Sequence, residues 1–133
     1  MSIGTIEWEK SGKLTDINSI ADIESTIREI EALNSDTPIG VMVIKTNGES
    51  LLFTVGDKNS FLNYYPKSYS HTGVGSYSSC TSKPLKGTFE FLFLGHYSEV
   101  ALKNTIPMYS VLEVLDQFLK KVGMPNGIDW EMD

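Results

Sequence analysis

Apolar residues recur at every third or fourth position in two segments of the chain, which predicts two amphipathic helices. The first stripe is Ile20, Ile23, Ile27, Ile30 and Leu33. The second stripe is Met108, Val111, Leu112, Leu115, Phe118, Leu119 and Val122. Asn18 or Ser19 is suited to cap the first helix, and Gly123 to stop the second. Each helix therefore presents one apolar face to a core.

Alternating apolar and polar residues predict strands at both ends of the chain. Residues 3–10 place Ile6 and Trp8 on the same side of a strand. Residues 128–133 alternate in the same way over a short closing strand. Its inward residues would be Ile128, Trp130 and Met132, and its outward residues Asp129, Glu131 and Asp133.

Two hairpins are predicted between the helices. Residues 39–46 and 49–56 flank Asn47-Gly48, a pair that favours a two-residue turn because both residues tolerate positive φ. A second turn is predicted at Gly95-His96, after the alternating phenylalanines of residues 89–93. The predicted pairs are Ile44 with Leu51, Met42 with Phe53, Phe91 with Val100 and Phe89 with Leu102.

Residues 57–86 are rich in Ser, Gly and Tyr and predict a long loop or an irregular strand pair, with a short strand over 61–65. Together these elements predict an α+β fold: an antiparallel sheet of about five to seven strands with two helices packed on it. The 133 residues are expected to form a single domain, 1–133.

Charge is distributed unevenly along the chain, whose formal net charge is −6. Residues 16–36 have six acids and one arginine, whereas residues 57–86 have four lysines and one acid. An acidic surface repels nucleic acid and speeds encounters with basic partners. The chain has no run of about 18 apolar residues, a single cysteine and no basic, apolar start, so we expect a cytoplasmic protein that does not enter a membrane.

Catalytic and metal-binding patterns are weak in this sequence. Cys80 and His71 could form a thiolate–imidazolium pair, but no local signature surrounds them. His96 is expected in an exposed turn, and Glu90 and Glu99 on a solvated sheet face. A structural zinc site needs four Cys or His ligands, and the chain offers three. We therefore expect no catalytic residues, no metal and no cofactor.

The C-terminal third carries a family resemblance. Residues 87–132 combine a strand, a proline-led helix, a Gly-x-Pro stop and a tryptophan in a final strand, and the spacing of Gly123, Pro125 and Trp130 is the most specific part. This arrangement resembles the immunity proteins of bacterial polymorphic toxin systems, specifically the first-numbered immunity family, which often neighbours deaminase toxins. The resemblance implies a protein that binds a cognate toxin and blocks its active site, with structural roles for those three residues.

Two surfaces are candidates for the toxin contact. The first is the acidic helix, through Asp22, Glu24, Glu29 and Glu31, which could mimic the phosphates that a nucleic-acid-processing cleft expects. The second is the Ser/Gly/Tyr segment, through Tyr65, Tyr69 and Tyr77 as rigid anchors. A nucleic-acid-binding or small-ligand-binding module, or an enzyme of unfamiliar type, is the alternative to toxin binding.

Separate variants test the two surfaces. Lysine at positions 24, 29 and 31 should slow association with the toxin and remove its salt dependence, because the steering charge is reversed. Alanine at the three tyrosines should weaken the complex by about 2 kcal/mol or more for each anchor. Association kinetics at two ionic strengths, together with the dissociation constant, measure both effects; unchanged values for a variant reject its surface.

Overall fold

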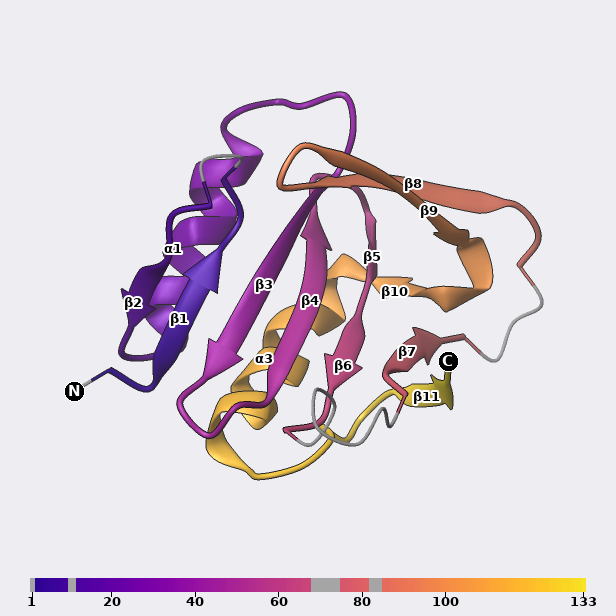
Figure 1. Cartoon of the computed structure of the whole chain (residues 1–133). Coiled ribbons are helices and arrows are strands. Elements are labelled where there is room, and N and C mark those ends of the chain that lie inside the picture. The colour runs from indigo at the N-terminus through magenta and orange to yellow at the C-terminus, as the bar shows by residue number, and fades with distance from the viewer. Residues whose placement is uncertain (1, 10–11, 68–74, 82–84) are drawn as a thin grey trace.

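The computed structural model describes residues 2–9, 12–67, 75–81 and 85–133 (Figure 1). The strands are β1 (Gly4–Glu7), β2 (Thr15–Ile17), β3 (Ile39–Lys45), β4 (Ser50–Val55), β5 (Asn59–Phe61), β6 (Asn63–Tyr65), β7 (Tyr77–Cys80), β8 (Thr88–Phe93), β9 (His96–Ala101), β10 (Thr105–Pro107) and β11 (Asp129–Met132). The helices are α1 (Ile20–Glu31) and α3 (Val111–Lys120), with the 3₁₀ turns η1 (Leu102–Asn104) and η2 (Met108–Ser110). The α+β class predicted from sequence is confirmed.

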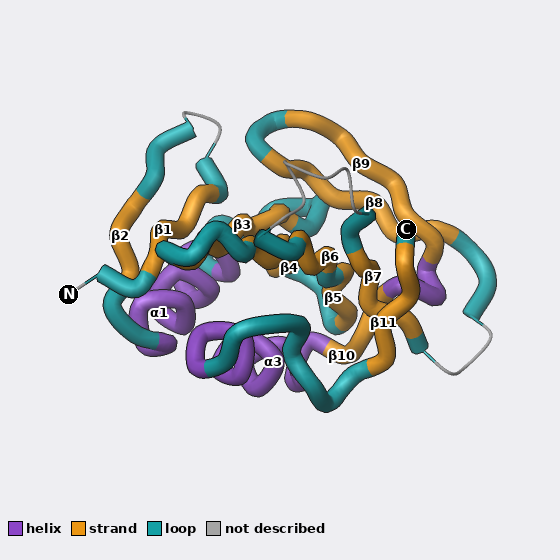
Figure 2. The backbone as a smooth tube through the Cα atoms, turned by 60° about the horizontal axis from the view of Figure 1, so that its bottom comes forward, coloured by secondary structure: helices purple, strands orange, loops and turns teal. Residues whose placement is uncertain are grey.

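One large sheet organises the described residues. Its strand order is β11-β7-β6-β4-β3-β1-β2, and the β8–β9 hairpin joins it through one parallel pairing of β8 with β3. Strands β10 and β5 form a separate two-stranded sheet. Helices α1 and α3 lie side by side on one side of the central strands, and β8 and β9 lie on the other (Figure 2).

Hydrophobic residues form a core on each face of the β3–β4 hairpin. On the helix side, Val43, Leu51 and Phe53 are fully buried together with the inner faces of α1 and α3. On the opposite side, Leu52 packs with Phe89 and with other aromatic residues near β8. Strands covered on both faces are apolar at nearly every position rather than at alternate ones. The burial of β4 fits this, since all five residues after Ser50 are buried.

The predicted register of the first hairpin is wrong by one residue. The observed pairs are Val41 with Phe53, Met42 with Leu52 and Val43 with Leu51, in place of Met42–Phe53 and Ile44–Leu51. Thr46 joins Asn47 and Gly48 in a three-residue loop, in which the Gly48 N–H donates to the Lys45 carbonyl at 3.0 Å. Gly48 follows the turn with φ 97°. This is a type I turn plus one residue of positive φ, a common alternative to the two-residue turn.

The second hairpin turns at Leu94-Gly95 rather than at the predicted Gly95-His96. Both turn residues have positive φ, 51° and 83°, as a two-residue hairpin turn requires. The observed pairs are Phe89 with Val100, Glu90 with Glu99 and Phe91 with Ser98, in place of Phe91–Val100 and Phe89–Leu102. A shift of two residues keeps each side chain on its predicted face, so Phe89 and Phe91 are still buried.

Both predicted helices are confirmed, although their ends differ from the sequence pattern. Leu33 lies beyond α1 and is 55% exposed, and Val122 lies beyond α3 and is 76% exposed. Ser19 is the N-cap residue of α1, but its side chain makes no capping bond. Instead the Asp22 carboxylate accepts from the Asn18 N–H at 2.6 Å. Acidic groups are favoured in a first helical turn because of the unpaired N–H groups there.

Short strands account for the difference between the five to seven strands expected and those observed. Strands β2, β5, β6 and β10 are each three residues long, too short for a periodic pattern. Residues 57–86, predicted as a loop or an irregular strand pair, include β5, β6 and β7. The closing strand is confirmed as β11, but Met132, predicted inward, is 67% exposed.

Gly4 is predicted to be essential for the pairing of β1 with β3. A Cβ at this position would lie 2.4 Å from the backbone oxygen of Ile44, which cannot move without disturbing the sheet. Gly4→Ala should therefore lower the free energy of unfolding by about 2–3 kcal/mol, measured by chemical denaturation. Gly12→Ala is the control, since a Cβ there meets only the tip of Glu7 at 3.8 Å and its positive φ accounts for about 1 kcal/mol. Equal losses in the two variants would contradict this prediction.

Candidate functional site

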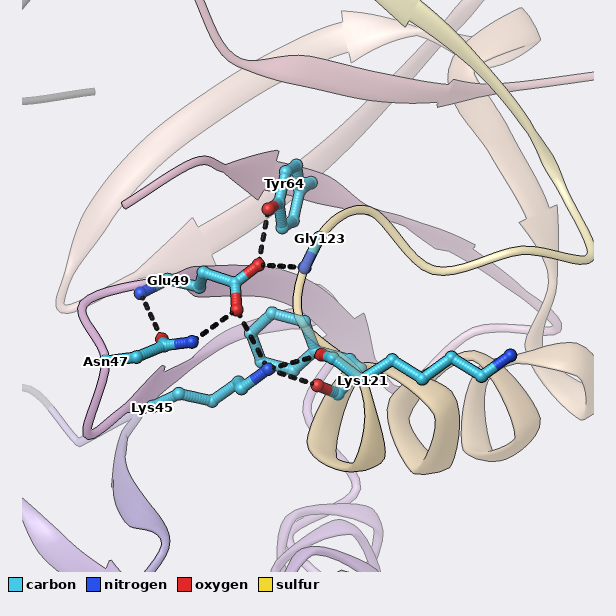
Figure 3. A network of polar contacts seen from close by, with 7 residues as sticks. Lys45, Asn47, Glu49, Tyr64, Lys121 and Gly123 are labelled. Atoms are coloured by element: carbon cyan, nitrogen blue, oxygen red, sulfur yellow. Dashed lines mark hydrogen bonds and ion pairs between the residues drawn. The ribbon is translucent and has the colours of Figure 1, made fainter. Parts of the chain in front are cut away.

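A buried carboxylate joins the first hairpin to the C-terminal end of α3 (Figure 3). Glu49 follows the hairpin loop, and its side chain is 1% exposed. Oε1 accepts from Lys45 Nζ at 2.9 Å and from Asn47 Nδ2 at 2.7 Å. Oε2 accepts from the Tyr64 hydroxyl at 2.5 Å and from the Gly123 N–H at 2.8 Å. Every oxygen of this carboxylate is thus doubly hydrogen-bonded.

Lys45 extends the same network to the helix. Its Nζ donates to the carbonyls of Phe118 and Lys121, each at 2.7 Å, and lies 4.8 Å from the centre of the Phe118 ring. The last carbonyls of a helix have no partners within the helix and attract cations. Lys45 therefore stabilises the end of α3 at the same time as it neutralises Glu49.

The hydrogen bonds decide the protonation state of Glu49. Burial raises its pKa, but the bonds from Tyr64, Asn47, Lys45 and Gly123 outweigh burial and lower the pKa to about 2. Burial, and then the bond to Glu49, raise the pKa of Tyr64 above its ordinary value. Glu49 is therefore ionised and Tyr64 neutral near pH 7. The carboxylate is fully engaged, and its role in this arrangement is to hold the fold together.

The three residues that carry the family resemblance also have structural contacts. Gly123 has φ 100° and supplies an N–H to Glu49, so its positive φ has a direct use. Pro125 is buried, and its carbonyl accepts from the Trp130 indole N–H at 2.9 Å. The Trp130 ring lies 6.3 Å from the Tyr64 ring. These contacts fasten residues 121–130 to the sheet.

Hydroxyl and amide groups support the strands near the C-terminal end. The Asp133 carboxylate, predicted outward, accepts from Ser76, from Ser78 at 2.6 Å and from Asn63 at 3.0 Å. Similarly, Glu131 accepts from the buried Asn104 amide at 2.7 Å. Glu131 and Asp133 therefore bond to neighbouring segments of the chain instead of facing only solvent.

An open groove lies between α1 and the start of α3. Ile27 and Arg28 of α1 face Met108, Tyr109 and Leu112 across it, and the groove encloses about 220 Å³. This volume is below the usual size of a small-molecule pocket but is suited to side chains of a protein partner. Tyr109 is 87% exposed and Leu112 is 37% exposed, although the sequence pattern placed Leu112 in the core. We call this feature the α1–η2 groove.

Glu24 and Glu31 line the α1–η2 groove, so the structure brings together two of the four predicted acids. Successive residues of a helix are rotated by roughly 100°, so Asp22 and Glu29 lie on the other flank of α1. Asp22 bonds to the Asn18 N–H, and Glu29 is exposed. The acidic residues of α1 therefore form two separate charged flanks, and the flank with Glu24 and Glu31 borders the α1–η2 groove.

The predicted tyrosine anchors lie elsewhere. Tyr65 of β6 is half-buried and packs against the Leu52 cluster. Tyr77 of β7 is half-buried, and its ring lies 6.4 Å from that of Tyr64. Tyr69 is outside the described residues. The two described tyrosines therefore contribute to packing, in place of the predicted role as exposed anchors.

Tyr109 was missed because it lies off the apolar stripe of its helix. The residues on either side of it in the groove, Met108 and Leu112, were assigned to the core by the stripe. The available signal was an aromatic residue in the first turn of the predicted helix, between Pro107 and Val111. Periodicity identifies buried positions and gives no information on exposed aromatic residues.

The residues considered for chemistry do not converge on a site within the described chain. Cys80 lies in β7, where burial and then Glu131 and Asp129 raise the pKa of its thiol, the opposite of what a nucleophile requires. His71 is outside the described residues. His96 is exposed at the start of β9. Among the described residues no group of three or more His, Cys, Asp or Glu could hold a metal.

Comparison with known proteins gives no relative from which to infer a role: no protein-family model and no curated protein matches the chain. The resemblance of residues 87–132 to immunity proteins therefore stays a hypothesis. In the part of the chain that the structure describes, neither helix has the length and apolar character needed to cross a membrane.

The Glu49 network is predicted to make stability depend on acid pH. Because its pKa is lowered from 4.5 to about 2 on folding, Glu49 stabilises the protein above pH 4.5, and this contribution disappears as the pH falls towards 2. Glu49→Gln should lower the free energy of unfolding at pH 7 by about 3 kcal/mol and flatten its decline between these pH values. Denaturant titrations at several pH values measure both effects.

Two further variants control this prediction. Tyr64→Phe removes one hydrogen bond to the carboxylate and should reduce stability by about 1.5–3 kcal/mol. Glu99→Gln removes an exposed acid and should change stability by less than about 0.5 kcal/mol. A Glu49→Gln variant as stable as Glu99→Gln would show that the buried network contributes nothing.

Proposed function

We propose that this protein is an immunity protein that binds a secreted toxin, most consistently one that acts on nucleic acid, and occludes its active site. The observation that carries the proposal is the α1–η2 groove. It combines exposed apolar side chains with two acids on one concave surface. Apolar groups with an aromatic residue favour protein contacts, and acids favour partners with a positive cleft.

The charges of the groove are available to a partner. Among the described residues the structure records no ion pair or hydrogen bond for the side chains of Glu24, Arg28 or Glu31. By contrast, Asp116 is paired with Lys120 at 2.9 Å, and Glu131 with Lys103 at 3.7 Å. A toxin that binds nucleic acid needs a positive cleft, which attracts a surface with unpaired acids.

Co-purification is the direct test of this function. The partner to use is the toxin-like C-terminal domain of a large secreted protein encoded beside this chain. Co-expression of the two should give a stable complex, and the purified chain should abolish the toxin's activity at equimolar amounts. A neighbouring toxin domain that neither binds this chain nor loses activity would exclude the proposal, as would turnover of a substrate by this chain alone.

Reversing the groove acids is predicted to slow toxin association. Glu24→Lys with Glu31→Lys should lower the association rate constant at low ionic strength by about tenfold or more, because steering depends on the local potential. The matched control is Glu29→Lys with Asp16→Lys, which changes the net charge by the same amount at exposed sites outside the groove. Surface plasmon resonance at two salt concentrations compares the pairs; equal slowing would assign the effect to net charge alone.

A further inference from the structure

Tyr109 lies at the border of two hollows of the surface. It lines the α1–η2 groove on one side and, on the other, a hollow that includes Cys80 and Asp129. Glu31 in turn belongs both to the groove and to a hollow with Asp57 and Lys58. The α1–η2 groove therefore shares Tyr109 with one neighbouring hollow and Glu31 with another, and the Tyr109 side chain is 87% exposed between the first two.

The backbone of Tyr109 is held firmly although its side chain is exposed. The preceding residue, Met108, donates its N–H to the Lys58 carbonyl at 2.8 Å. Two residues after Tyr109, Val111 begins α3 and is fully buried. A tyrosine has only two side-chain torsions, so ordering it on binding is inexpensive. Its position is thus fixed before a partner arrives, which favours tight binding.

The chemistry around the ring selects one kind of side chain. No hydrogen bond is recorded for the Tyr109 hydroxyl within the described chain, and the ring face is open to solvent. Glu24 and Glu31 line the same groove together with Arg28, so the two acids outnumber the one cation there. A guanidinium group is planar, stacks on aromatic faces and forms paired hydrogen bonds with carboxylates, so an arginine satisfies both features at once. A lysine would supply the positive charge alone, without the planar group that stacks and forms paired hydrogen bonds.

We propose that Tyr109 anchors an arginine-bearing segment of the toxin, with the arginine between the Tyr109 ring and the acids of the α1–η2 groove. An apolar residue of the same segment packs on Leu112 and Met108. This inference rests on the proposed function and adds the anchor residue and the partner's chemistry to it. It also explains why Leu112 is exposed at a position where the sequence pattern predicts burial.

A short peptide tests the surface without the toxin. The probe is a blocked Arg-Leu-Arg peptide, and its control has citrulline, the neutral isostere, in place of both arginines. Amide NMR shifts of the full chain should change most over residues 24–31 and 108–112, and the citrulline peptide should leave them unchanged. Tyr109→Ala should weaken arginine-peptide binding by about threefold or more, in line with a cation–π contact. Largest shifts elsewhere, or equal binding of both peptides, would overturn the inference.

The toxin complex tests the anchor itself. Tyr109→Ala should raise the dissociation rate by about 30-fold or more, the effect of an interface hot spot, whereas Tyr109→Phe should stay near the wild type because the ring remains. Tyr97→Ala is the matched control, since Tyr97 is 62% exposed on β9, in the layer opposite the helices. Both tyrosines are exposed, so neither change should prevent folding.

The outcomes separate the inference from the proposed function. Equal dissociation rates for the Tyr109→Ala and Tyr97→Ala complexes overturn the inference and leave toxin binding in place. Failure of the wild-type chain to bind the toxin overturns the proposed function. A wild-type dimer that Tyr109→Ala dissociates, measured by analytical ultracentrifugation, also overturns the inference, because the groove would then receive a second copy of the chain.

Discussion

The burial of one ion pair constrains much of this structure. Lys45 and Glu49 flank the loop of the central hairpin, and both are withdrawn from water beneath the end of α3. A buried carboxylate is costly unless all its lone pairs are satisfied, and here the hydroxyl of Tyr64 and the N–H of Gly123 complete its set of donors. The charges of Lys45 and Glu49 are therefore tolerated only when the sheet, the end of α3 and the C-terminal segment are all in place. Because these elements depend on one another, the shifted pKa values of Glu49 and Tyr64 belong to a network with a structural role.

The central hairpin is also the point from which the two cores are built. Val41, Val43, Leu51, Phe53 and Val55 pack under the helices, and Met42 and Leu52 pack with the phenylalanines of β8 on the opposite face. A strand pair buried on both faces fixes the separation of the two layers. Helices α1 and α3 then lie side by side on one face, and the groove between them follows from that placement rather than from either helix alone (Figure 2).

The groove gives the proposed function a location and a chemistry. Only part of the acidity of α1 lies there, because helical rotation separates Glu24 and Glu31 from Asp22 and Glu29. Tyr109 contributes the exposed aromatic surface that was predicted at Tyr65 and Tyr77, which instead pack against the two cores. The polar residues near β7 likewise contribute to the fold, since Ser76 and Ser78 bond to Asp133. A basic partner meeting this surface encounters charge and apolar contact at the same place.

The sequence by itself determined the α+β class, both helices, the two hairpins and the closing strand, because each depends on local periodicity and turn residues. It also identified the acidic character of α1. It could not determine the hairpin registers. The first hairpin is apolar on both faces and accepts a slip of one residue without exposing its core, and a shift of two residues in the second leaves every side chain on its face. Strands of three residues have no period to detect. The buried network and the α1–η2 groove were decided only by tertiary structure. Tyr64 and Gly123 are distant in sequence from Lys45 and Glu49, as Tyr109 is from Glu24 and Glu31, and they meet only when the helices pack on the sheet.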